Sequence, residues 1–137
     1  MVRLQLALVS TALAMALTGV CGADISDASP DDGSGRCTFG ITPPTVVPVS
    51  GASYVFATLR PGSCTLTANP YSSTVCLSIE GDDSGGECAT KPGSQTAELY
   101  VAYRRGATYV EKGRGCAGLV TPPYTLCEDF PASRFTL

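Results

Sequence analysis

Histidine and tryptophan are both absent from this 137-residue chain. Without histidine, a serine nucleophile lacks the base that usually activates it at neutral pH, and a zinc site lacks a common ligand. Serine–lysine catalysis has only Lys91 and Lys112 to draw on, each beside Pro or Gly in an expected surface turn. No Gly-rich phosphate-binding loop precedes a helix, and no tryptophan is present to form a sugar platform. We therefore predict no catalytic residue and no cofactor.

The first 23 residues have the pattern of a secretory signal peptide. Arg3 is followed by an apolar run from Leu4 to Leu17, which is too short to span a bilayer comfortably, and then by small residues up to Ala23. We expect cleavage after Ala23 and a secreted protein. A lipoprotein anchored through Cys21 is the alternative, although Val20 stands where glycine, alanine or serine normally precedes a lipidated cysteine.

Residues 24–36 are acidic and rich in Ser, Gly and Asp, which predicts a disordered arm before a folded domain of residues 37–137. After residue 23 the chain has eight basic and twelve acidic residues, a net charge of −4. Nucleic acids and anionic lipid surfaces are therefore poor partners, because both attract cationic proteins. No membrane-spanning segment follows the leader, and we expect a monomer.

Six cysteines remain after the leader, and none of them has the short paired spacing of a zinc site. An even number in a small exported domain predicts three disulfides. Fifteen pairings are possible, and we favour those that close the shortest loops, because short loops close at the lowest entropic cost. The favoured pairs are Cys37–Cys64, Cys76–Cys88 and Cys116–Cys127.

The segment from Ser94 to Cys116 has the clearest structural pattern. Its apolar residues alternate along 97–103 with period 2, which is typical of a strand. A turn at Arg104, Arg105 and Gly106 would return the chain into a second strand at 108–110, so we predict a β-hairpin.

Further strands are predicted at 53–59, 63–68, 73–79 and 124–127, and residues 135–137 could add a last strand. The proline-rich residues 42–49 are expected to form an edge strand or a polyproline-like lead-in. Pro61-Gly62 and Pro70 are expected to end strands, and no helical periodicity follows the leader. The predicted fold is therefore all-β: an antiparallel immunoglobulin-like sandwich with disulfides, or alternatively a small, partly open β-barrel.

Two polar segments are candidate sites. The string from Gly81 to Gly86 is similar to the nucleophile segment of trypsin-like serine proteases, but an extra aspartate interrupts the match and no histidine is available. Asp82, Asp83 and Glu87 in the same loop are weak calcium candidates, since they lack the regular spacing of a calcium loop. The turn of Arg104, Arg105 and Gly106 is the candidate binding turn, because it would present two cations on an acidic protein.

With its leader, its cysteines and its many strands, the chain resembles small secreted immunoglobulin-like proteins of actinobacteria that have no assigned activity. It is similar in a second respect to the subtilisin-inhibitor family, because Cys88 and Cys116 enclose the expected hairpin before an apolar tail, as that family's last disulfide does. That family usually has four cysteines, and no reactive-loop motif matches here. The first resemblance implies a secreted, non-catalytic binding or envelope-associated module with an unknown protein or cell-envelope partner. The second implies a protease inhibitor, and a small secreted enzyme is the third alternative.

Overall fold

The computed structural model describes residues 34–137, which form seven strands and no helix. The expected leader, Cys21 and most of the acidic arm lie outside the described residues. The strands are β1 (Cys37–Val49), β2 (Ala52–Cys64), β3 (Ala68–Ile79), β4 (Glu87–Pro92), β5 (Ala97–Ala102), β6 (Thr108–Leu119) and β7 (Thr125–Thr136). Within this part of the chain there is no helix long and apolar enough to cross a membrane.

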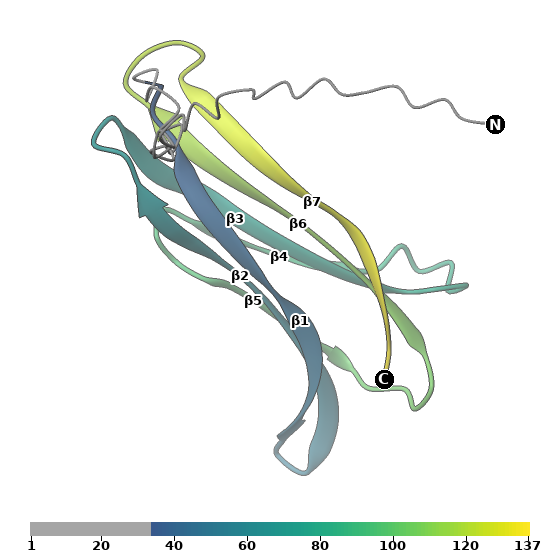
Figure 1. Ribbon diagram of the computed structural model, residues 1–137. Helices are drawn as coiled ribbons and strands as arrows, with labels where there is room; N and C mark the ends of the chain where they lie inside the picture. The colour runs from purple at the N-terminus through teal and green to yellow at the C-terminus, as the bar shows by residue number, and fades with distance from the viewer. Residues whose placement is uncertain (1–33) are drawn as a thin grey trace, which may run out of the picture. The chain divides into compact units, whose positions relative to one another are not determined.

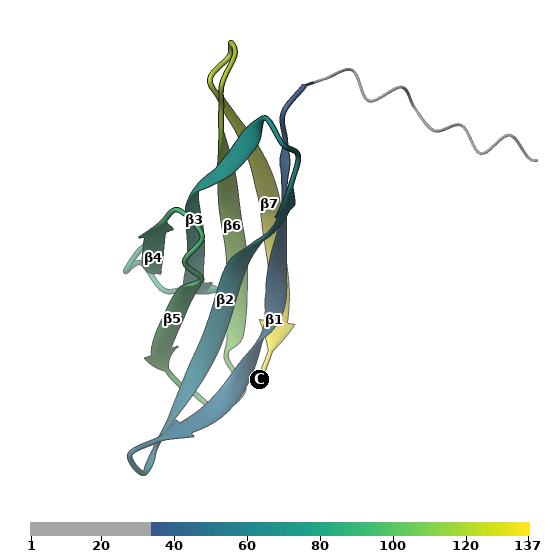
Figure 2. The same ribbon diagram turned by 90° about the vertical axis from the view of Figure 1, so that its left-hand side faces the viewer.

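The strands form two antiparallel sheets, with the orders β1-β2-β5 and β4-β3-β6-β7. Figures 1 and 2 show the sheets as two layers packed face to face. The strand order matches an immunoglobulin-like sandwich in which the fourth strand pairs with the third. The predicted fold class is confirmed, and the sheets remain two separate layers rather than one barrel.

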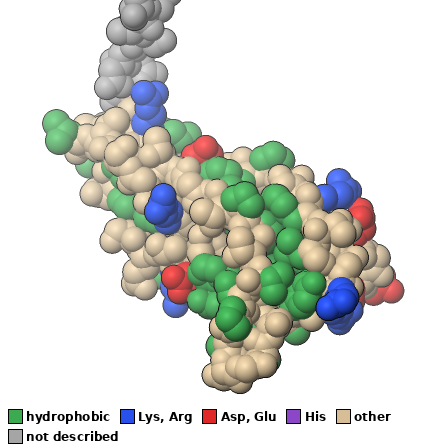
Figure 3. Space-filling view, turned by 60° about the horizontal axis from the view of Figure 1, so that its bottom comes forward, with side chains coloured by type: hydrophobic (Ala, Val, Ile, Leu, Met, Phe, Trp, Pro, Cys, Tyr) green, Lys and Arg blue, Asp and Glu red, His purple; other side chains and the backbone are tan. Residues whose placement is uncertain are grey.

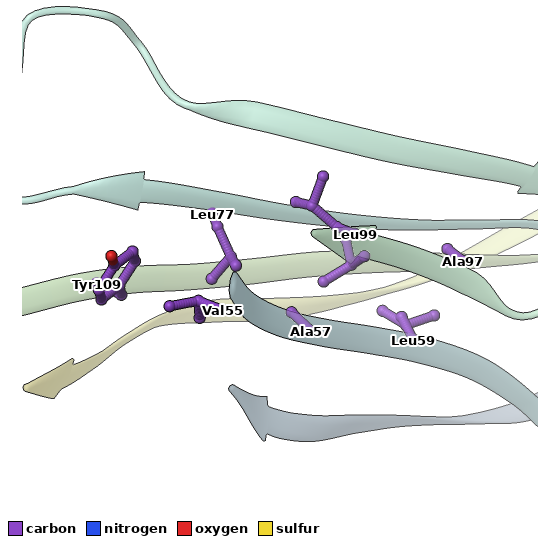
Figure 4. Close-up of a cluster of buried hydrophobic side chains, with 8 residues drawn as sticks. Val55, Ala57, Leu59, Leu77, Ala97, Leu99 and Tyr109 are labelled. Carbon is purple, nitrogen blue, oxygen red and sulfur yellow. The ribbon is translucent and has the colours of Figure 1, made fainter. Parts of the chain in front are cut away.

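The core lies between the two sheets. Side chains from β2, β5, β3 and β6 point toward one another across the gap (Figure 4). The buried cluster consists of Val55, Ala57, Leu59, Val75, Leu77, Ala97, Leu99 and Tyr109. In each strand these residues alternate with more exposed ones, because successive side chains of a strand point to opposite faces.

The predicted β-hairpin is wrong, although both of its strands exist. β5 pairs with β2 in the smaller sheet, whereas β6 pairs with β3 and β7 in the larger one. Residues 103–107 therefore cross from one layer to the other, as Figure 1 shows, and we call this segment the arch. The alternation specified which face of each strand is buried, but it did not specify the partner strand.

Pro61 and Pro70, which were expected to end strands, lie within strands, and Pro131 lies within a strand as well. Pro61 pairs with Phe39 in the part of β2 that lies beyond β5, so the strand has a neighbour on one side only. Pro70 lies at a register shift in β3, and Pro131 lies at one in the edge strand β7. Edges and irregularities tolerate proline because no ladder hydrogen bond is lost there. The short edge strand β4 was not predicted.

All six cysteines of the domain form disulfides, in the same pairs that loop length favoured: Cys37–Cys64, Cys76–Cys88 and Cys116–Cys127. Each disulfide joins two residues that are opposite each other on neighbouring strands of one sheet. Cys88 and Cys116 are not joined to each other, because each is bonded to a cysteine on a neighbouring strand. The disulfides strengthen single sheets, so the packing of one sheet on the other depends on the core.

The folded domain starts slightly before the predicted boundary. Arg36 and Thr65 exchange hydrogen bonds: the Arg36 amide donates to Thr65 Oγ1 at 3.0 Å, and the Thr65 amide donates to the Arg36 carbonyl at 2.9 Å. Gly35 is buried, and a Cβ there would lie 2.8 Å from the Thr67 carbonyl oxygen. Residues 35 and 36, which composition assigned to the arm, therefore pack against the domain.

Candidate functional site

Backbone hydrogen bonds hold the arch to two other parts of the protein and hold the residue that follows it to a third. At its start, the Tyr103 amide donates to Ser53 of β2 at 3.1 Å. At its tip, the Gly106 amide donates to the Leu137 carbonyl at 2.7 Å, and the Leu137 amide donates to Ala107 at 3.2 Å. The Glu80 amide donates to Thr108 at 2.9 Å, just after the arch. The arch is thus fixed to β2 and to the residue after β7, and the first residue of β6 is fixed to the β3–β4 loop.

Tyr109 supports the arch from inside the core. Its side chain is fully buried, and its hydroxyl donates to the Ala102 carbonyl at 3.0 Å while accepting from the Arg104 amide at 2.8 Å. Similar tyrosine contacts occur where immunoglobulin-like chains cross between sheets. One side chain on β6 therefore satisfies two backbone groups of the connection that leads to it.

The β3–β4 loop, residues 80–86, supports the arch from outside. Arg104 Nη1 donates to Asp82 Oδ2 at 3.1 Å, and the Ser84 amide donates to Asp82 Oδ1 at 3.1 Å. Hydrogen bonds from Ser84, followed by the charge of Arg104, hold the pKa of Asp82 below its usual range. Because the Arg104 side chain is largely exposed, this ion pair positions the loop and adds little to stability.

A small pocket of about 110 Å³ opens where the loop meets the arch. Leu77, Ile79, Val101 and Tyr109 contribute apolar lining, while Asp82, Ser84, Glu87 and Arg104 contribute polar lining. The cavity is therefore partly apolar with an ion pair beside it, an arrangement that can hold a small side chain or a small polar group.

Arg105 differs from its neighbour. Its side chain is exposed, and within residues 34–137 no ion pair or hydrogen bond connects it to another side chain. Gly106, the next residue, has φ +73°, and the Ala107 amide donates to the Arg104 carbonyl at 3.1 Å, which closes a tight turn around Arg105. The predicted binding turn thus consists of one cation that is held by Asp82 and one that is free to meet a partner.

Figure 3 shows the molecule from the side that carries the β1–β2 turn and the arch. Hydrophobic side chains gather near the centre of this view, and charged side chains lie mostly toward its rim. Val46 and Val49, next to the β1–β2 turn, are the exposed large hydrophobic residues of β1.

The acidic loop does not bring its carboxylates together. Asp82 bonds to Arg104 and Ser84, while Glu80 pairs with Arg134 of β7 at 2.9 Å. Among the described residues, no group of three His, Cys, Asp or Glu side chains is placed to hold a metal ion. Asp83 and Glu87, the other calcium candidates, are exposed.

Four tyrosines of the domain lie apart from one another rather than on one binding face. Tyr109 is in the core, and Tyr103 is half-buried in the arch. Tyr100 is exposed on β5 and packs on Phe56 with the ring centres 4.5 Å apart, while Tyr124 is exposed in the β6–β7 loop. They do not form a shared surface.

Sequence reasoning missed Glu111, the one buried acid among the described residues. It is 3% exposed, and its Oε1 atom has no hydrogen-bond partner in this part of the chain. Burial raises its pKa to about 7. Strand periodicity could have predicted this burial. Glu111 lies two residues after Tyr109 in the same strand, and residues two apart in a strand share a face.

Comparison with known proteins finds no family model, no curated protein and no solved structure that matches this chain.

Proposed function

We propose that this protein is a secreted, non-catalytic binding module that recognises a protein or cell-envelope partner through the arch and the adjoining pocket. The observation that carries the proposal is the contrast between a fixed backbone and a free cation. The arch is held by Tyr109 from inside and by Asp82 from outside, while Arg105 is exposed at its tip. A preorganised loop loses little entropy on binding, so its free side chains are well suited to recognition.

The partner should contribute an acidic group that meets Arg105. A single arginine on an acidic protein gives orientation, because its guanidinium pairs with a carboxylate or phosphate in a defined geometry. The pocket of about 110 Å³, which is lined by the preceding residue Arg104, would receive a neighbouring small group of the same partner.

The cysteines indicate in what kind of environment the protein resides. Three disulfides indicate an extracellular or otherwise oxidising environment. Secretion with cleavage after Ala23 is our proposal for how the chain reaches it, with a lipid on Cys21 as the alternative. The intact mass of the exported protein tests this, since cleavage predicts an N-terminus at Asp24 and no added lipid mass.

We further propose that the module acts as a monomer. Two of the four edge strands carry prolines that discourage pairing with a second copy: β1 contains Pro43, Pro44 and Pro48, and β7 contains Pro131 at a register shift. Proline at an edge interrupts the row of hydrogen-bond donors that another strand would need. Size-exclusion chromatography with light scattering should give the monomer mass.

The binding experiment compares one arginine variant with one lysine variant. The exported protein is immobilised and exposed to culture supernatant and to solubilised envelope from its producing cells. Arg105→Ala should lose most of the captured material, whereas Lys91→Ala, which removes an exposed cation from β4, should retain it. Equal capture by the two variants would show that the arch is not the binding site.

A protease inhibitor is the second candidate, because Arg105 could enter the specificity pocket of a trypsin-like protease. The tight turn around Arg105 is an argument against it, since proteases bind their substrates in an extended conformation. Inhibition of a panel of trypsin-like and exported serine proteases at micromolar concentration would favour the inhibitor; we expect no inhibition.

A further inference from the structure

Glu111 is a buried acid that the binding site does not use directly. It faces inward from β6, opposite Leu77 of β3 on one side and Ser133 of β7 on the other. The neighbouring inward positions of β6 show what it packs near. Tyr109 belongs to the core cluster, and a Cβ on Gly113 would lie 2.5 Å from Leu59 and 3.0 Å from Ile41 of the opposing sheet. The carboxyl group is therefore enclosed between the sheets.

No cation faces this carboxyl from the elements packed against it. β1 and β3 contain no acidic or basic residue, and Arg60 is exposed on β2. Lys112 and Arg114 alternate with the inward residues of β6, and Arg134 of β7 pairs with Glu80. On the inward side, the other titratable groups are two tyrosines and one acid. The hydroxyl of Tyr109 is bonded to the arch, Tyr103 packs against the core cluster from the arch, and Glu128 of β7 is an exposed acid opposite Gly115.

β7 is the edge strand next to Glu111 in its own sheet. Most of its residues are exposed, including Ser133 directly opposite, and its register with β6 shifts between Glu111 and Gly113. The Cys116–Cys127 disulfide fixes the first part of β7, whereas the part after the shift has no such bond. A charge on Glu111 would reach water most easily by displacing this second part, residues 133–136.

That part of β7 leads directly to the arch. Leu137, the residue after β7, accepts from the Gly106 amide and donates to the Ala107 carbonyl. If residues 133–136 leave β6, these two bonds to the arch are lost with them. Glu111 is therefore linked, through the end of β7, to the backbone that presents Arg105.

We propose that Glu111 is a pH-sensitive latch: while it is protonated the end of β7 stays closed on β6, and its ionisation favours opening of residues 133–137 and loosening of the arch. This regulation matters for binding only if the proposed function of the arch is right, but the latch can be tested without a partner. Its physical basis is that an unpaired carboxylate is far costlier to bury than a neutral carboxyl group. The pKa of Glu111, raised by burial to about 7, supports it.

The expected size follows from linkage between proton binding and opening. In the open state Glu111 should titrate near the 4.5 of an unburied glutamate, and in the closed state near 7. The opening equilibrium should therefore rise by about a hundredfold between pH 4.5 and pH 8, with most of the change below pH 7.

Hydrogen–deuterium exchange of the exported protein, corrected for the intrinsic pH dependence of exchange, tests the latch. We expect the peptide covering residues 130–137, including the Leu137 amide, and the amide of Gly106 to lose protection as the pH rises from 4.5 to 8. The β3–β4 peptide, whose strands are joined by the Cys76–Cys88 disulfide, should keep its protection. A flat profile for residues 130–137 would overturn the proposal.

Variants separate the latch from general pH effects. Glu111→Gln and Glu111→Met should both abolish the pH dependence at residues 130–137, and Glu111→Met serves as the second variant if the buried amide of glutamine prevents folding. Glu98→Gln, which removes an exposed acid from β5, should behave as the wild type. If the pH dependence persists in both Glu111 variants, another group causes it and the latch does not exist. The exchange measurement does not use capture of a partner. A failure of the latch would therefore be distinguishable from a failure of the proposed function, which the Arg105→Ala capture experiment tests.

Discussion

The hydroxyl of Tyr109 accepts a hydrogen bond from the backbone amide of Arg104, five residues earlier in the chain, at 2.8 Å. The contact joins the first buried residue of β6 to the middle of the connection that crosses between the sheets. It fixes the arch relative to the core, and with it the position from which Arg105 projects.

Replacing Tyr109 with phenylalanine should therefore destabilise the domain while keeping most of the ring's packing. The Ala102 carbonyl and the Arg104 amide would both lose their partner, and we expect the free energy of unfolding to fall by about 1–3 kcal/mol. Urea denaturation measures it. Tyr100→Phe, at an exposed tyrosine on β5, is the control and should stay within about 0.5 kcal/mol of wild type. Equal stability of the two variants would contradict the role of the Tyr109 hydroxyl.

Glu111 should make the stability of the whole domain depend on pH. Its pKa is raised in the folded state, so the folded protein binds more protons than the unfolded chain between about pH 4.5 and pH 7. The free energy of unfolding should fall as pH rises through this window, by about 3 kcal/mol in total. Denaturant titrations at pH 5 and pH 8 measure the difference, and it should be much smaller for Glu111→Gln. An unchanged difference in that variant would refute the assignment.

Gly115 should tolerate no side chain. It is buried on the inward face of β6, and a Cβ there would overlap the ring of Phe39 from β1. Gly115→Ala should destabilise the domain by about 1–3 kcal/mol through overpacking. Gly40→Ala in β1 is the matched control, because the nearest atoms to its Cβ are 3.9 Å away. Thermal unfolding of the two variants should differ clearly, and similar melting temperatures would show that Phe39 moves aside freely.

The exported protein should contain no free thiol. Titration under denaturing conditions without reductant should find none, because all six cysteines of the domain are paired. Peptide mapping of the oxidised protein should recover Cys37–Cys64, Cys76–Cys88 and Cys116–Cys127. Two or more free thiols, or a Cys88–Cys116 peptide, would be incompatible with the observed sheets.

Local patterns in the sequence were sufficient for the class of fold and for the disulfides. Alternation of apolar residues identified the strands around Val55, Leu77 and Leu99, since a strand places every second side chain on one face. The disulfide pairs agree with the short-loop preference because each joins cysteines on neighbouring strands that follow one another in the chain.

The turn at 104–106 was predicted, but its role was not. Turn chemistry depends on a few adjacent residues, and Gly106 does adopt a positive φ. Whether the chain then pairs with the previous strand or crosses to the other sheet depends on competing partners far away in sequence. β5 pairs with β2 at six positions, from Tyr54–Ala102 to Leu59–Ala97, and β6 pairs with β3.

The sequence by itself therefore determined which residues face inward, which cysteines are near enough to pair, and which residues form the turn. Only the tertiary structure decided that Tyr109 supports the arch, that Asp82 binds Arg104 and leaves Arg105 free, and that Glu111 is buried without a partner. The reason is physical: alternation and turn propensity arise between residues a few positions apart. Burial, charge pairing and a raised pKa instead depend on which distant strands pack around each side chain.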